Sequence, residues 1–287
     1  MRALYELPAP AKLNLFLHVV GKRPDGYHLL QSVFVLIDWQ DTLHIERRGD
    51  AALHRHDLGA ALPADDLCLR TARALQQASG TPWGADIHID KHIPWGAGLG
   101  GGSSDAATVL LALNRLWQLH WPRSRLLQIA SGLGADVPFF VHGHPAWVEG
   151  IGEQLSALPD AAALPRRYAV LKPPQALPTA AVFASPHLLR SEKPAIVADF
   201  LAAPRGFGRN DLQPAAQALS SEVAQALERL RGTFGNSRMT GSGSAVFAWL
   251  DDVGPCPSWP GSLPQGWTGR LCQALPVHPL VGWAPGS

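Results

Sequence analysis

Hydrophobic and polar positions alternate in the first fifty residues of the chain in the manner of β-strands. Leu13, Leu15 and Leu17 recur at every second position, and the alternation stops at the glycines and the proline of residues 21–26. Residues 32–37 form a nearly continuous apolar run, and residues 41–46 alternate again. Period-two alternation predicts half-buried strands, and a short apolar run predicts a buried one. We therefore predict a β-rich beginning with a turn or hairpin between residues 21 and 27.

The pattern changes to a helical period after residue 65. Apolar residues in the segment 65–79 recur at intervals of three and four, which places them on one face of a helix. The same spacing continues from Ala106 to Leu116. Further helices are predicted at 124–131 and 211–231, short strands at 87–89, 139–142, 168–171 and 245–249, and irregular structure in the Pro- and Gly-rich segment 253–269.

Strands and helices in this mixture predict an α/β protein. A length of 287 residues exceeds one ordinary domain by about the ratio that suggests two. The segment 155–166, rich in Ala and Pro, is the best boundary. We therefore expect an N-terminal domain of residues 1–157 and a C-terminal domain of residues 158–287.

Charge and cysteine content narrow the possible partners. The chain carries 24 Lys and Arg against 23 Asp and Glu, a balance without the positive excess that nucleic acid or an anionic membrane attracts. Cys68, Cys256 and Cys272 form no C-x-x-C pair, which suits free thiols in a reducing compartment. No apolar run approaches the roughly 20 residues of a membrane helix, and the first residues do not read as a signal peptide. We expect a cytoplasmic protein.

Five glycines occupy the seven positions from Gly96 to Gly102, between a predicted strand and a predicted helix. Glycine allows positive φ and a close approach of backbone amides to a ligand, and a helix N-terminus attracts anions. This arrangement predicts a phosphate-binding loop. It is not the dinucleotide fingerprint, because residues 117–125 contain no acidic residue, and it is not a P-loop, because Ser103 rather than Lys follows the last glycine.

Residues 94–107, with the pattern P-x-G-A-G-L-G-G-G-S-S-D-A-A, resemble the ATP-binding motif of the GHMP kinases (galacto-, homoserine, mevalonate and phosphomevalonate kinases). Residues 10–15 and 240–247 are similar to the N-terminal and C-terminal motifs of that family. The resemblance implies an N-terminal ribosomal-protein-S5-domain-2-like ATP-binding domain and a C-terminal ferredoxin-like domain. It implies ATP as co-substrate, with Mg²⁺ held through the ATP phosphates. The implied ATP-binding residues are Lys91, Pro94, Gly96, Ala97, Gly98, Leu99, Gly100, Gly101, Gly102, Ser103, Ser104, Gly241 and Gly243.

Further motifs resemble one branch of the GHMP kinases, which phosphorylates the 2-hydroxyl of 4-diphosphocytidyl-2-C-methyl-D-erythritol in the non-mevalonate isoprenoid pathway. They are residues 11–17, 23–28 and 134–138, with Pro178, Thr179 and Phe183. The resemblance implies Asp136 as the acceptor of the hydroxyl proton and Lys12 as the cation beside it. Asn14, two residues along the same strand, would share the face of Lys12. Tyr27 would stack on the cytosine, His28 would bond its polar edge, Phe183 would form the opposite wall, and Thr179 is a further substrate contact.

Alternatives and departures remain. Another GHMP kinase of the homoserine or mevalonate type is the nearest alternative, and an RNA-binding module is a remote one. Asp66 stands where the branch commonly has an Asn that helps to read adenine. The pairs His54/His56 and His142/His144 could bind a metal, but without an evident carboxylate we expect them to be surface residues. We expect a small-molecule substrate with a cytidine diphosphate group, no nucleic acid, no membrane, and a monomer or weak homodimer.

Overall fold

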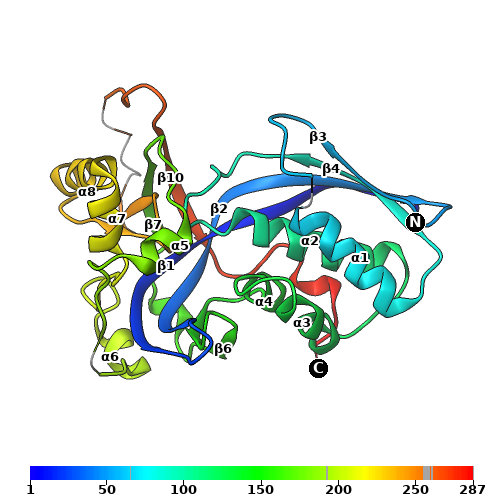
Figure 1. Ribbon diagram of the computed structural model, residues 1–287, viewed down its shortest axis with the longest axis horizontal. Helices are drawn as coiled ribbons and strands as arrows, with labels where there is room; N and C mark the ends of the chain where they lie inside the picture. The colour runs from blue at the N-terminus through cyan, green and yellow to red at the C-terminus, as the bar shows by residue number, and fades with distance from the viewer. Residues whose placement is uncertain (65, 192, 255–258, 260, 287) are drawn as a thin grey trace.

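A computed structural model describes residues 1–64, 66–191, 193–254, 259 and 261–286. Its central element is strand β2 (His28–Arg48), which forms a long antiparallel hairpin with β1 (Ala3–Lys22) across the turn at residues 23–27. This hairpin runs through both halves of the molecule (Figure 1). The predicted strands and turn are confirmed, and the segments 32–37 and 41–46 belong to one strand.

Helices cover one face of the first half of the sheet. The parallel strands β3 (Leu53–Asp57) and β4 (Gly84–Asp90) extend the sheet beside β2. In β4, Ala85, Ile87 and Ile89 are buried, whereas alternate residues face away from the core. The buried side chains pack against α1 (Leu67–Ser79), α2 (Gly101–Leu116), α3 (Arg123–Ser131) and α4 (Val137–His142), below the sheet in Figure 1.

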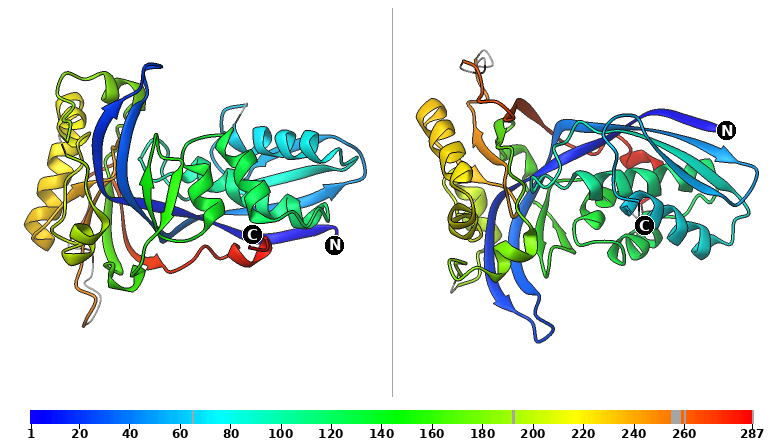
Figure 2. Two further views of the ribbon diagram at one scale, coloured as in Figure 1. Left: turned by 90° about the horizontal axis from the view of Figure 1, so that it is seen from below. Right: turned by 45° about the horizontal axis from the view of Figure 1, so that its top comes forward.

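The second half continues the sheet from β2 through β10 (Thr268–Leu275), which pairs with β7 (Arg167–Lys172). Helices α7 (Gln213–Leu219) and α8 (Ser221–Phe234) pack on this part, at the far end of the molecule from α1 in both views of Figure 2. The remaining elements are β5 (Ala146–Glu149), β6 (Gln154–Ala157), η1 (Ala161–Ala163), α5 (Thr179–Ala184), α6 (Val197–Ala202), β8 (Arg238–Met239), β9 (Val246–Trp249) and η2 (Val281–Trp283).

The predicted α/β class is confirmed, but two local predictions are wrong. Residues 139–142, predicted as a strand, belong to α4, which has Pro138 in its first turn and ends at the left-handed Gly143. The helix predicted at 211–231 is two helices, because Ser220 adopts an extended conformation between them. The Ser220 hydroxyl donates a hydrogen bond to the Gln175 side chain, which holds this break.

The described part of the segment 253–269 is irregular up to Trp267, as predicted, and β10 begins at Thr268. The C-terminal tail (residues 276–286) then crosses back to the first half, where it lies beside α3 and α4 (Figure 1). Leu280 and Ala284 join the core of that half, and the Arg123 amide donates to the Pro285 carbonyl. No helix among the described residues is long and apolar enough to cross a membrane. The division at residue 157 stays a prediction.

Candidate active site

A cavity of about 330 Å³ lies where the two halves meet the hairpin. Strand β1, the glycine loop before α2, the start of α4 and the second glycine element at residues 241–243 all contribute to its wall. The predicted residues that line it are Lys12, Asn14, Gly96, Gly98, Gly100, Ser103, Asp136, Thr179, Phe183, Gly241 and Gly243. The structure therefore brings most of the predicted site together from segments more than 200 residues apart.

Lys12 is a buried cation, with only 3% of its surface exposed. Its ammonium lies 3.5 Å from an Asp136 carboxylate oxygen and 4.3 Å from the centre of the Phe34 ring. Burial lowers the pKa of Lys12, and the attraction of Asp136 opposes that shift. A poorly hydrated ammonium at a cavity wall is placed to stabilise negative charge that develops in front of it.

Asn14 shares the face of Lys12, as predicted, and its Oδ1 accepts a hydrogen bond of 2.5 Å from the Lys12 ammonium. The Asn14 amide group donates to the Ser32 hydroxyl at 3.0 Å, which fixes which way the amide points. The Asn14 backbone amide donates to the Thr240 hydroxyl at 2.9 Å. These contacts lock the Lys12 side chain to both halves of the protein.

Asp136 immediately precedes α4, and its side chain is 30% exposed. It is the one carboxylate among the described residues that line the 330 Å³ cavity. Gly152 lies beside it, and a Cβ atom built on Gly152 would be in ordinary van der Waals contact with the Asp136 carboxylate, at 3.8 Å. An accessible carboxylate beside a cation has the geometry required of a proton acceptor for a hydroxyl substrate.

The backbone conformation of the glycine loop, residues 96–102, requires glycine at several positions. Gly96, Gly98 and Gly100 have φ values of +63°, +74° and +73°, which side chains of L residues rarely adopt. A Cβ atom on Gly98 would lie 2.4 Å from the Thr240 carbonyl oxygen. The second glycine element packs directly on this loop, with the Ala245 amide donating to the Ala97 carbonyl at 3.1 Å.

Helix α2 begins at Gly101, and its N-cap residue, Gly100, has no side chain that could cap it. The first amides of a helix have no intrahelical acceptor, and their combined dipole attracts anions. Ser103, in this first turn, lines both the 330 Å³ cavity and an adjoining one of about 190 Å³ formed mainly by the loop. Ser104, in contrast, is fully buried and lines neither of these two cavities. The loop and the helix start together suit a polyphosphate.

Lys91 lies beside the same helix turn but is already ion-paired. Its ammonium contacts the Asp41 carboxylate and, at 2.6 Å, that of Asp105. Burial lowers the pKa of Lys91, but the two carboxylates outweigh this effect and raise it overall. Asp41 also accepts the Ile93 amide at 2.7 Å, so this cluster anchors the segment that leads into the loop. Direct contact of Lys91 with nucleotide stays a prediction.

A second cavity, of about 540 Å³, adjoins the first and shares Thr179 and Phe183 with it. Tyr27 and His28 line its other side, and Tyr27 is 61% exposed. The sequence suggested Tyr27 and Phe183 as opposite walls for a base. In the structure the His28 ring stacks on Phe183, with centroids 5.1 Å apart and an angle of 19° between the planes. The Thr179 hydroxyl lies 2.9 Å from that of Ser242, which links this cavity to the second glycine element.

Asp66, the residue that departs from the branch pattern, has a structural role. Its carboxylate caps α1 by accepting the Leu69 amide at 3.1 Å, and it forms an ion pair with Arg55. Asp65 lies outside the described residues. The second histidine pair also differs from expectation, because His142 and His144 are partly buried rather than at the open surface.

Sequence reasoning missed several residues that hold the site. Thr240 stands in the second glycine motif, so its position was a usable signal. Ser32 and Asp41 carried no signal, because their partners are 18 and 50 or more residues away and only strand pairing brings them together.

The chain matches two family models, GHMP kinases N terminal domain over residues 66–144 and GHMP kinases C terminal over residues 195–254. It is 62% identical over 288 residues to a 4-diphosphocytidyl-2-C-methyl-D-erythritol kinase of Methylibium petroleiphilum, covering 99% of each chain, and 56% identical to that of Paracidovorax citrulli, also covering 99% of each. A solved structure of 4-(cytidine 5'-diphospho)-2C-methyl-D-erythritol kinase superposes with a TM-score of 0.71 at 38% identity, covering 85% of this chain and 89% of that one.

A homoserine kinase of Cytophaga hutchinsonii superposes with a TM-score of 0.67 at 15% identity, covering 97% of this chain and 96% of that one, and shares the fold. Sequence identity above 50% over the full length of the two named relatives, together with the matches to both domain models, is far stronger evidence of family than this similarity of fold. The chain belongs to the GHMP kinases, in the family of the 4-diphosphocytidyl-2-C-methyl-D-erythritol kinases.

Proposed function

We propose that this enzyme transfers the γ-phosphoryl group of ATP to the 2-hydroxyl of 4-diphosphocytidyl-2-C-methyl-D-erythritol, giving the 2-phosphate and ADP in the non-mevalonate pathway to isoprenoid precursors. The observation that carries the proposal is the position of the Lys12–Asp136 pair, in a cavity with the glycine loop on one side and the aromatic cavity on the other. A nucleotide on the loop and a cytidine in the aromatic cavity would meet at this pair.

Asp136 accepts the proton of the attacking hydroxyl, and Lys12 stabilises the charge that forms on its oxygen. Phosphoryl transfer depends mainly on positioning and on charge stabilisation, which the buried and hydrogen-bonded Lys12 is built to supply. Amides of the glycine loop and of the first turn of α2 hold the phosphates of ATP.

Mg²⁺, when bound with ATP, neutralises charge on the phosphates. The hydroxyl of Ser103 and the carboxylate of Asp136 line the same cavity, and oxygen donors of this kind suit Mg²⁺. The phosphates of ATP would supply most of the ion's direct contacts other than water, and Ser103 and Asp136 would reach it chiefly through its bound waters, because Mg²⁺ in kinases keeps several of them.

The cytosine lies against Phe183, with the exposed Tyr27 as the second wall. His28 occupies the face of Phe183 in the structure, so it turns aside to bond the base edge when substrate enters. Stacking on aromatic rings is worth roughly 1–3 kcal/mol per base, enough to select a nucleotide-linked alcohol over a simple one. Homoserine and mevalonate have no base that could stack on the aromatic rings of this cavity.

The proposal extends to the setting of the enzyme, a small-molecule kinase of the cytoplasm that acts as a monomer or weak homodimer without nucleic acid. The balance of 24 basic and 23 acidic residues supports the exclusion of RNA as a partner.

The decisive experiment measures ADP formation from ATP with 4-diphosphocytidyl-2-C-methyl-D-erythritol, homoserine and mevalonate in parallel. We expect turnover with the cytidyl substrate alone. Turnover with another alcohol would preserve a kinase but overturn the cytosine pocket. Folded protein without turnover on any alcohol would overturn the proposal, and salt-dependent binding of a random RNA oligonucleotide would then favour the RNA-binding alternative.

A further inference from the structure

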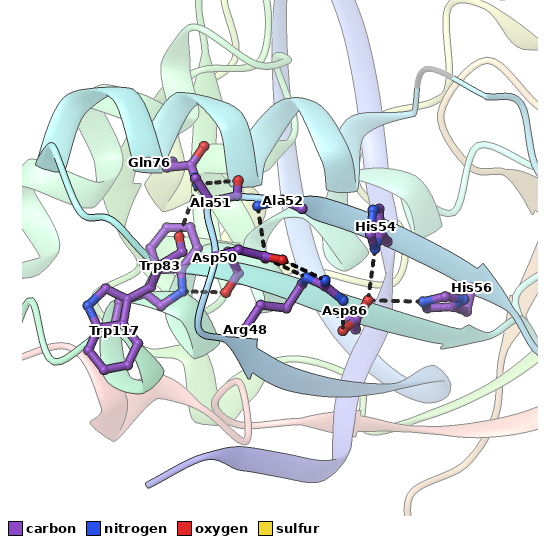
Figure 3. A network of polar contacts seen from close by, with 11 residues as sticks. Arg48, Asp50, Ala51, Ala52, His54, His56, Gln76, Trp83, Asp86 and Trp117 are labelled. Carbon is purple, nitrogen blue, oxygen red and sulfur yellow. Dashed lines mark hydrogen bonds and ion pairs between the residues drawn. The ribbon is translucent and has the colours of Figure 1, made fainter.

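The outer face of the sheet in the first half carries a cluster of histidine and carboxylate side chains that the kinase reaction does not use. His54 and His56 lie two residues apart on edge strand β3, so both project from the same face. Asp86 lies opposite His54 in the parallel pairing of β3 with β4. Figure 3 shows both imidazole rings turned toward the Asp86 carboxylate, on the strand face remote from helix α1.

The three side chains meet at one carboxylate oxygen. Asp86 Oδ1 lies 3.2 Å from His54 Nδ1 and 3.2 Å from His56 Nε2. Each residue can offer one ligand atom such that all three atoms lie within 4.8 Å of one another. A tetrahedral zinc ion with bonds of about 2.0–2.1 Å has ligand atoms roughly 3.3 Å apart, so the two His–Asp separations already match an edge of that tetrahedron.

The surroundings of Asp86 orient it without using Oδ1. Arg48 donates to the other oxygen, Oδ2, at 2.8 Å. The positive charge of Arg48 would oppose a bound cation, but Asp50 pairs with the same guanidinium through two bonds of 2.8 Å and offsets it. The net charge of Asp50, Arg48 and Asp86 together is therefore −1. Support of a ligand carboxylate by an outer hydrogen bond is a usual feature of metal sites.

The ligands are also accessible and held in place. The side chains of His54 and His56 are 51% and 47% exposed, and that of Asp86 is 21% exposed. The His88 ring stacks on His56 with centroids 4.5 Å apart, which restricts the orientation of the His56 imidazole. Backbone pairing of β3 with β4 fixes the separation of the two strands that carry the ligands.

We propose that His54, His56 and Asp86 form a binding site for a four-coordinate divalent transition-metal ion of the zinc type, with solvent as the fourth ligand. Two imidazole nitrogens and one carboxylate oxygen suit Zn²⁺, whereas Mg²⁺ and Ca²⁺ prefer oxygen ligands alone. The ion would join the edge strand β3 to β4. The sequence showed no carboxylate near His54 and His56, and that expectation is wrong, because the pairing of β3 with β4 brings Asp86 beside them.

The test is a titration of the metal-free full-length protein with Zn²⁺ against a chromophoric chelator, in the absence of ATP. We expect one saturable equivalent per chain that is lost in the double variant His54→Ala/His56→Ala and weakened at least tenfold in Asp86→Asn, which keeps the shape of the carboxylate. The matched control is His92→Ala, because the His92 side chain is 51% exposed, like that of His54, and its ring lies 3.7 Å from the Asp90 carboxylate without a second histidine in the ion pair. Its affinity for Zn²⁺ should be unchanged.

Two further measurements distinguish a specific four-coordinate site from weak, unspecific attraction of metal ions to the hydrogen-bonded side chains. Co²⁺ in place of Zn²⁺ should give the visible absorption of a four-coordinate ion in the wild type and not in the double variant. Zn²⁺ should raise the thermal unfolding midpoint of the wild type but not that of the double variant. The proposal fails if no stoichiometric binding occurs, if the double variant binds Zn²⁺ as well as the wild type, or if His92→Ala weakens binding equally.

Discussion

The Lys12 ammonium lies 3.5 Å from the Asp136 carboxylate, although Lys12 is buried in strand β1 and Asp136 immediately precedes helix α4. If Asp136 accepts the substrate proton, Asp136→Asn should lower kcat by about 10²–10⁴-fold, the usual contribution of general base catalysis. The KM for ATP should change little, because the glycine loop is untouched. Steady-state kinetics with both substrates varied would measure this.

The control for that variant is Asp160→Asn, at an exposed carboxylate before η1, which should leave kcat unchanged. A kcat for Asp136→Asn within tenfold of the wild type would show that the carboxylate is not the proton acceptor.

Removal of the aromatic walls should weaken binding of the cytidyl substrate and not of ATP. Tyr27→Ala and Phe183→Leu should each raise the KM for the cytidyl substrate by roughly 5- to 150-fold, which corresponds to a loss of about 1–3 kcal/mol of stacking. Tyr5→Ala is a matched control, because Tyr5 is 59% exposed against 61% for Tyr27 and bonds only Glu46 among the described residues. Equal effects of Tyr5→Ala and Tyr27→Ala would argue against a base pocket at Tyr27.

Gly98→Ala should disrupt the contact between the two glycine elements. The positive φ of Gly98 would cost a non-glycine residue about 1–2 kcal/mol, and the added Cβ atom would also meet the Thr240 carbonyl at 2.4 Å. We expect a lower free energy of unfolding in urea and a higher KM for ATP.

Gly232→Ala provides the comparison, because Gly232 lies in α8 with nothing within 4 Å of an added Cβ atom. It should stabilise the protein by about 0.5–1 kcal/mol, the usual gain from Ala in a helix. Equal stability of the two variants would contradict the role assigned to Gly98.

His278 should make the protein sensitive to acid. Its ring is fully buried, its Nδ1 accepts the Leu280 amide at 3.1 Å, and burial lowers its pKa to about 4 from an ordinary value of 6.5. Above pH 6.5 the ring is neutral in both states. As pH falls from 6.5 toward 4, the unfolded chain binds a proton that the folded chain cannot, so stability falls by up to about 3 kcal/mol.

His278→Asn keeps an acceptor for the Leu280 amide but does not titrate in this range. Urea unfolding at pH 7 and pH 5 should therefore show a smaller loss of stability for the variant than for the wild type. An identical loss in both proteins would place the acid sensitivity elsewhere, for example at His18 or His142, whose pKa values burial also lowers.

The sequence predicts correctly those elements whose conformation is determined by interactions between residues close together in the chain. The glycine loop, the helix behind it and the β1–β2 hairpin all have their signals within a few neighbouring residues. The sequence pattern of residues 139–142 predicts a strand wrongly, because three apolar residues and a histidine are too few to show a helical or a strand period. Pro138 and Gly143, at the two ends of the segment, favour the helix.

Contacts between distant segments had no comparable signal. The Asn14–Ser32 and Lys91–Asp41 contacts and the meeting of Asp86 with two histidines depend on strand register, which a sequence does not state. The family resemblance supplied Lys12 and Asp136 as candidates. The structure added how Lys12 is held, by Asn14 and through it by Ser32 and Thr240.

The C-terminal tail has a consequence for the order in which the protein matures in the cell. During synthesis on the ribosome, helices α2, α3 and α4 emerge long before residues 276–286, yet Leu280 and Ala284 complete their core and Arg123 bonds the carbonyls of that tail. Domains generally fold in the order in which they are translated. Here the first half to be translated finishes its core only after the second half has left the ribosome.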